Sequence, residues 1–86
     1  MNRKEFINEV SRRKGISHTK AYHSVNAVMD TIRMLLQEGN EIEIGGFGTF
    51  LVITDLKGEC VPVFKVGSAL RNVLNTFENG KKESNG

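Results

Sequence analysis

Glycine occupies three of the four positions from Gly45 to Gly48, and this run separates two segments that resemble β-strands, residues 41–44 and 47–53. Both segments carry the β-branched and aromatic residues that fit a pleated sheet. Because glycine weakens a strand, its presence there indicates a bulge or the close approach of a backbone or ligand. We therefore expect a strand edge with few side chains, whose backbone N–H groups are open to an anion.

The length of 86 residues allows one domain, and 38% hydrophobic residues suffice for a small core. Chains of this size are often stabilised by association. The single cysteine excludes an intrachain disulfide and favours a reducing compartment. No segment approaches membrane-spanning length, and no apolar signal region follows the first residues. We expect a cytoplasmic protein with no membrane contact.

Charge is unevenly distributed, although the net charge is only +2. Residues 1–20 hold six basic and two acidic side chains, whereas residues 21–56 hold one basic and five acidic side chains. A basic end of this kind is compatible with nucleic acid, and equally with an ordinary solvated surface.

Two helices are predicted in the first half of the chain. Asn2 and Glu5 can form a capping box, and Gly15 is placed to end the first helix. Ser17 can cap a second helix, and this helix should end at residues 39–40. The apolar positions of this second helix are Ala21, Val25, Val28, Ile32 and Leu35. Their spacing predicts a seam that packs against a partner, and the two helices should form a hairpin.

Residues 55–58 carry a turn signal, and residues 59–64 predict a third strand, with Pro62 arguing for an edge. A third helix should start near Val66 and present apolar residues as far as Phe77. Residues 78–86 are polar and are expected to be disordered. The predicted fold class is α+β, with a two-helix hairpin, a three-stranded antiparallel sheet and a C-terminal helix.

Catalytic and metal-binding patterns are weak. His18 and His23 lie five residues apart on one helix and therefore diverge. Cys60 is interpreted as a buried strand residue rather than a nucleophile. Residues 45–48 lack the lysine and the following helix of a phosphate-binding loop. We expect no enzyme, no metal and no cofactor.

Several motifs together resemble one family. They are GGFGTF at 45–50, the opening residues 1–3, the helix junction 15–17, the segment 38–40 and VPVFKVGSAL at 61–70. In this respect the chain resembles the bacterial histone-like DNA-binding proteins, HU and integration host factor, over residues 1–77. The resemblance implies an intertwined homodimer or heterodimer, associated with the nucleoid, whose saddle and two β-ribbon arms hold double-stranded DNA.

The long basic arm of that family is absent here. The chain turns back at 54–60, without the family's Arg-Asn-Pro tip, and Asp55 and Glu59 flank the single basic residue, Lys57. Arms supply the wedge that kinks DNA. The resemblance therefore implies a saddle that binds DNA with reduced bending.

The resemblance also assigns site residues. Those matching phosphate-contacting positions are Arg3, Gly46, Phe47, Gly48 and Arg71. The apolar seam and three phenylalanines exceed what a monomer of this size can bury, so we expect a dimer interface. Its residues are Val25, Val28, Met29, Ile32, Leu36, Phe47, Phe50 and Phe64.

Two functions of different class remain. One is a small architectural dimer that condenses DNA without sequence preference. The other is an interaction protein that does not bind DNA and that pairs with, or antagonises, a full-length HU-type relative.

Overall fold

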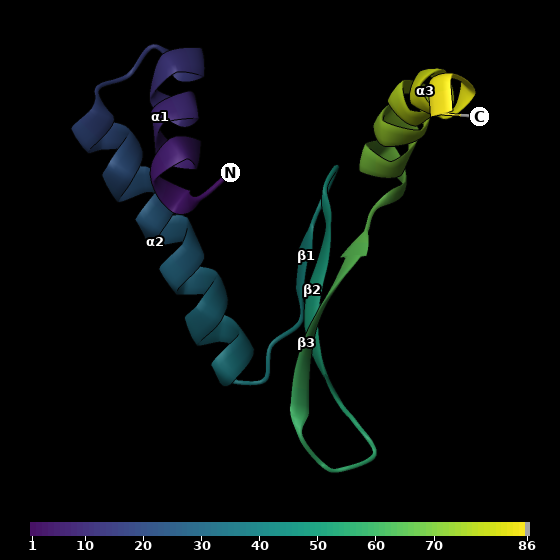
Figure 1. Ribbon diagram of the computed structural model, residues 1–86. Helices are drawn as coiled ribbons and strands as arrows, with labels where there is room; N and C mark the ends of the chain where they lie inside the picture. The colour runs from purple at the N-terminus through teal and green to yellow at the C-terminus, as the bar shows by residue number, and fades with distance from the viewer. Residues whose placement is uncertain (86) are drawn as a thin grey trace. The chain divides into compact units, whose positions relative to one another are not determined.

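A computed structural model describes the backbone of residues 1–85 and the side chains of residues 1–76. The elements, in chain order, are α1 (Arg3–Lys14), α2 (His18–Gln37), β1 (Ile42–Ile44), β2 (Gly48–Thr54), β3 (Cys60–Val66) and α3 (Ser68–Asn85) (Figure 1). This order and the α+β class confirm the sequence-based prediction. The chain divides into two compact units, Met1–Met34 and Leu35–Gly86.

The caps of α1 are those that its sequence predicts. The Asn2 side chain accepts a hydrogen bond from the Glu5 backbone N–H at 2.8 Å, and the Glu5 carboxylate accepts one from the Asn2 N–H at 3.1 Å. Gly15 ends the helix in the left-handed region, at φ 63°. Glycine adopts this conformation without steric cost, so the chain can reverse within three residues.

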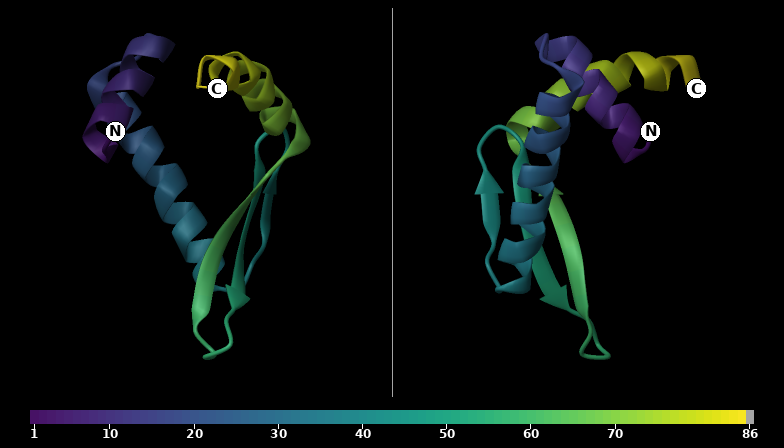
Figure 2. Two further views of the ribbon diagram at one scale, coloured as in Figure 1. Left: turned by 45° about the vertical axis from the view of Figure 1, so that its right-hand side comes forward. Right: turned by 90° about the vertical axis from the view of Figure 1, so that its left-hand side faces the viewer.

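In the first unit, α1 packs beside the first half of α2 as a helical hairpin (Figures 1 and 2). Ser17 caps α2, because its hydroxyl accepts the Lys20 backbone N–H at 3.1 Å. The buried core is small and consists of Ile7, Ala21 and Val25, with Val10 and Ile16 packed against it. Such a core leaves much apolar surface of the hairpin uncovered.

The second unit contains an antiparallel sheet with strand order β1-β2-β3. Phe50 pairs with Ile42 on one side and with Phe64 on the other. The β2–β3 hairpin closes through a turn at residues 55–59 (Figure 2). Observed strand limits differ from the predicted ones by one or two residues. Val66 extends β3 because it still pairs with Gly48.

The last helix begins at Ser68, two residues later than predicted, and is assigned through Asn85. The segment 78–86, for which the sequence predicts disorder, lies outside the residues whose side chains are described, and that expectation stays a prediction. Among the described residues, no helix combines the length and the apolar character needed to cross a membrane.

Candidate functional site

The glycine run forms the turn between β1 and β2. The Phe47 backbone N–H donates to the Ile44 carbonyl at 3.0 Å, and Gly46 has φ +80°. The backbone conformation therefore requires glycine at position 46, because residues with a side chain rarely adopt a positive φ. A Cβ on Gly45 or Gly46 would meet nothing within 4 Å, so both face open space.

Gly48 has a different reason for being glycine. It is buried at the start of β2, and a Cβ there would lie 2.5 Å from the Lys65 carbonyl oxygen. The strand order places β2 at the centre of the sheet. The expected strand edge is thus corrected: the run is an exposed turn followed by a closely packed residue of the central strand.

A hollow of about 290 Å³ lies beside this turn. The residues that line it are Glu43, Ile44, Gly45, Gly46, Gly48, Gly67, Ser68 and Ala69. The first N–H groups of an α-helix have no partner within the helix and carry partial positive charge. Because Ser68 and Ala69 open α3, the hollow combines a helix N-terminus with the glycine turn, and the Glu43 carboxylate opposes this charge.

Gly67 joins the glycine run to α3. Its N–H donates to the Phe47 carbonyl at 2.9 Å, and its own carbonyl accepts the Arg71 N–H at 2.9 Å. The structure therefore brings together four of the five predicted phosphate-contacting residues in the second unit. Arg71 lies on the first turn of α3 and is exposed.

The fifth residue, Arg3, belongs to the first unit. It opens α1, and its Nη1 donates to the Asn26 Oδ1 on α2 at 3.1 Å. This hydrogen bond fixes the side chain against α2 and, among the described residues, leaves the other guanidinium N–H groups available to an acceptor.

The predicted interface residues divide between core and surface. Val25 is 7% exposed and packs with Ile7 and Ala21, so it is a core residue of its own hairpin. Val28 and Met29 are exposed at 58% and 42%. The whole seam was expected to face a partner, whereas α1 covers its first half.

Phe6 was not among the predicted interface residues, although much of it is exposed. It is 46% exposed and lines a hollow of about 250 Å³ with Val10, Val28 and Met29, all from the first unit. The position of Phe6 in the apolar stripe of α1 already indicated from the sequence that it could pack against another surface. In the second unit, the rings of Phe47, Phe50 and Phe64 pack together, with centroids 4.8–6.4 Å apart. Ile32 and Leu36 are half-buried.

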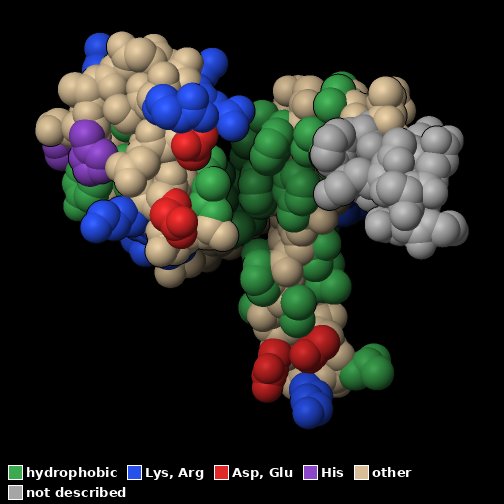
Figure 3. Space-filling view, turned by 45° about the horizontal axis from the view of Figure 1, so that its top comes forward, with side chains coloured by type: hydrophobic (Ala, Val, Ile, Leu, Met, Phe, Trp, Pro, Cys, Tyr) green, Lys and Arg blue, Asp and Glu red, His purple; other side chains and the backbone are tan. Residues whose placement is uncertain are grey.

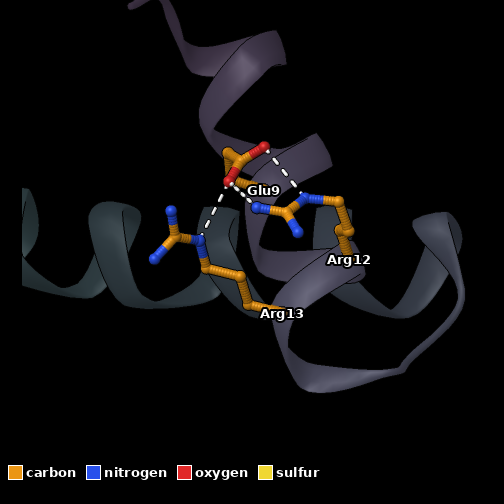
Figure 4. Close-up of polar contacts among 3 residues, drawn as sticks. All are labelled: Glu9, Arg12 and Arg13. Atoms are coloured by element: carbon orange, nitrogen blue, oxygen red, sulfur yellow. Dashed lines mark hydrogen bonds and ion pairs between the residues drawn. The ribbon is translucent and has the colours of Figure 1, made fainter.

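A carboxylate holds two arginines on α1 (Figure 4). Glu9 Oε1 lies 2.7 Å from Arg12 Nη2 and 2.9 Å from Arg13 Nε. The hydrogen bonds from Arg12, which have the larger effect, and from Arg13 lower the pKa of Glu9 to about 2. This cluster was not predicted, although the (i, i+3) and (i, i+4) spacing of its residues is typical of ion pairs on a helix.

The turn after β2 is organised by Asp55. Its Oδ1 accepts the backbone N–H groups of Lys57 at 2.8 Å and of Glu59 at 2.9 Å. Leu56 is fully exposed there. Acidic, basic and hydrophobic side chains stand together at this end of the hairpin (Figure 3). The turn predicted from the sequence is confirmed as a short, closed connection.

Cys60 is exposed, which corrects the expectation that it is buried. It pairs with Thr54 at the end of the hairpin, where little packs over the edge strand β3. His23 lies edge-on to Tyr22, with ring centroids 5.4 Å apart. In the part of the chain that the structure describes, no group of three or more His, Cys, Asp or Glu could hold a metal ion.

Residues 1–58 match the sequence profile of a family described as "Bacterial DNA-binding protein". DNA-binding protein HU of Geobacillus stearothermophilus is 32% identical over 89 residues, which span 86% of this chain and 99% of that protein. HU from Thermotoga maritima is a similar solved structure, with TM-score 0.74 and 32% identity, covering 86% of this chain and 98% of that one.

An Anabaena HU–DNA cocrystal structure has the same fold, with TM-score 0.71 and 22% identity over 86% of this chain and 97% of that one. The alignment with the Geobacillus protein contains a gap. It is 89 residues long but includes only 86% of this 86-residue chain, or about 74 residues. About 15 residues of the relative (89 less 74) therefore have no counterpart here.

Proposed function

This chain belongs to the bacterial DNA-binding protein family, and from that premise we propose that it is a small architectural protein that binds double-stranded DNA as a dimer. The observation that carries the proposal is the family match over residues 1–58, which includes the glycine turn. The fold shared with HU structures supports it. Its place is on the bacterial nucleoid in the cytoplasm, and the proposal includes no catalytic activity.

The proposed contacts are to phosphates. In the second unit, the turn at Gly46, the start of α3 and the Arg71 side chain offer backbone N–H groups and a guanidinium group, and Arg3 offers another in the first unit. Phe47 and Gly48 position the turn. Backbone N–H and guanidinium groups are the usual phosphate donors, and such contacts carry no base information. Binding should therefore be independent of sequence.

Bending is proposed to be weak. The connection at 55–59 is short and bears two carboxylates, so it cannot act as a long basic arm. The family match ends at Gly58, within this connection. We infer that the additional residues of the relatives belong here, and that this chain lacks the ribbon that wraps and kinks DNA.

A dimer is supported by apolar surface that each unit leaves uncovered. Phe6, Val28 and Met29 are more than 40% exposed in the first unit, and Phe47 and Phe64 in the second. Exposed patches of this kind mark association surfaces. A second copy of this chain, or an HU-type relative with the same complementary face, would bury them.

A salt titration tests DNA binding. With roughly two to three phosphate contacts per subunit, log affinity against log salt should have a slope of about −4 to −5 for the dimer, at about −0.9 per phosphate. The variant Arg3→Glu with Arg71→Glu should bind DNA far more weakly than the unaltered protein. The matched control, Arg33→Glu with Lys57→Glu, makes the same change in net charge and should bind nearly as well as the unaltered protein. Equal losses in both variants would reject the assigned contacts.

The acidic end of the β2–β3 hairpin supports the alternative function, an interaction protein that does not bind DNA. Asp55 and Glu59 repel phosphates, and a subunit with this end could pair with a longer relative to give a defective dimer. If no DNA binding is seen at low salt, co-purification with a full-length HU protein becomes the deciding measurement. Formation of a mixed dimer with reduced DNA affinity would establish this alternative.

A further inference from the structure

Basic side chains gather at the closed end of the helical hairpin, far from Arg3 along α1. This basic end comprises Arg12, Arg13, Lys14 and Lys20. The first three form the last turn of α1, and Lys20 lies in the first turn of α2, three residues beyond the Ser17 cap. Figure 3 shows Lys and Arg side chains exposed on this unit. Among the residues whose side chains are described, Glu9 is the carboxylate paired with them, so the group carries a net charge of about +3 at neutral pH.

Glu9 fixes the direction of two of these cations. Its carboxylate binds Arg12 through both Nε and Nη2, at 3.3 and 2.7 Å, and binds Arg13 through Nε. A guanidinium group has five N–H donors, so each arginine keeps donors that Glu9 does not use. Both side chains are about two-thirds exposed, at 66% and 71%. The pair is thus held in place and open to an anionic ligand.

The helix dipole accounts for part of this pattern, since cations stabilise a helix C-terminus. It does not account for Lys20, because a cation near the start of α2 is unfavourable for the dipole. The two helices nevertheless bring all four cations to the same end of the hairpin. Ligand binding explains this convergence, whereas the stability of the separate helices does not.

Arg12 differs from Arg3 in position and in direction, whereas Lys14 lies about 16 Å further along α1 than Arg3 on nearly the same side of the helix. Arg12 follows Arg3 by nine residues, which corresponds to about 13 Å along the helix axis and about half a turn around it. Arg3 is drawn to Asn26 on α2, whereas Arg12 is drawn to Glu9 on its own helix. A duplex held at Arg3 therefore does not reach Arg12 from the same side.

We propose that the basic end is a second phosphate-binding surface for double-stranded DNA, so that one dimer can bind two duplexes. The inference rests on the proposed function and extends it. Without a wrapping arm, this protein would condense DNA by bridging duplexes rather than by bending one. The contacts are to phosphates, so bridging should be independent of sequence and sensitive to salt.

Capture of one duplex by another tests the proposal. A duplex tethered to beads is mixed with protein and with a dye-labelled duplex of unrelated sequence, and the retained dye is measured at low salt. The variant Arg12→Gln with Lys14→Gln should reduce captured dye by about tenfold, while affinity for a single duplex changes by less than about threefold, because few phosphate contacts are lost there. The control, Arg33→Gln with Lys57→Gln, removes one arginine and one lysine elsewhere and should capture normally.

A second variant, Lys14→Gln with Lys20→Gln, leaves the Glu9 pairs intact and should also lose capture if the first variant folds poorly. Capture that is unchanged in both variants, or that falls equally in the control, would overturn the inference. Single-duplex binding without any capture by the unaltered protein would reject bridging alone. Absence of single-duplex binding would reject the proposed function as well.

Discussion

Gly48 and Phe64 meet so closely between β2 and β3 that a Cβ on Gly48 would lie 2.6 Å from Phe64 Cζ. The ring also packs against Phe47 and Phe50, and the backbone carbonyl oxygen of Lys65 would lie 2.5 Å from the same Cβ. The aromatic cluster of the sheet therefore depends on the missing side chain of Gly48, which lies two pairs along the ladder from Phe50 and Phe64.

Replacement of Gly48 by alanine should destabilise the protein by about 1–3 kcal/mol, because overpacking forces neighbouring atoms to shift. Thermal unfolding followed by circular dichroism measures the effect. Gly45→Ala is the control in the same glycine run, since nothing lies within 4 Å of its Cβ position and its φ is not positive. Equal melting temperatures for the two variants would contradict the packing seen at Gly48.

Association should determine stability. The exposed apolar residues of both units imply a dimer, so the melting temperature should rise with protein concentration. Val28→Asp places a charge on this surface and should give a monomer or an unfolded chain. Thr31→Asp, on the same helix at an exposed polar position, should leave the dimer intact. A compact monomer of the unaltered protein in light scattering at micromolar concentration would disprove the dimer.

Linear DNA should not bend appreciably on binding. Leu56 is the only apolar residue at the hairpin end, and five turn residues at about 3.3 Å each cannot reach around a duplex about 20 Å wide. Energy transfer between dyes at the two ends of a duplex of about 30 base pairs should stay constant on saturation. A large increase in transfer would mean that another segment, such as the one containing Lys81 and Lys82, acts as an arm.

Acid should remove the stabilising effect of Glu9. Its pKa in the folded protein, about 2, lies below the ordinary value of 4.5. The ion pairs with Arg12 and Arg13 therefore stabilise the fold above about pH 4.5, and this contribution is lost as pH falls towards 2. The Glu9→Gln variant should have a lower melting temperature than the unaltered protein at neutral pH. This difference in melting temperature should disappear as the pH falls towards 2. A carboxyl titration by NMR with its midpoint near 4.5 would contradict the observed contacts.

The local elements were predictable from sequence because their signals are local. The capping box of Asn2 and Glu5, the left-handed Gly15 and the turn at 55–59 each depend on residues within a few positions of one another. Strand limits were less accurate, because Val66 joins β3 only through its pairing with Gly48, which is distant along the chain.

The sequence named the members of the candidate site, but it did not distinguish their roles in the fold. Gly46 and Gly48 look alike in sequence, yet one is required by its positive φ and the other by contact with β3. Likewise Val25 and Val28 belong to one apolar stripe, but α1 buries the first and leaves the second exposed.

The sequence by itself determined the order of the elements and their caps and turns, since these are set by backbone conformation and short-range hydrogen bonds. It also determined the family resemblance, which depends on residue motifs alone. Only the tertiary structure decided which apolar side chains are core, why Gly48 has no side chain, and that Glu9 orients two arginines. Those properties depend on which atoms meet in space, and residue spacing constrains such contacts without specifying them.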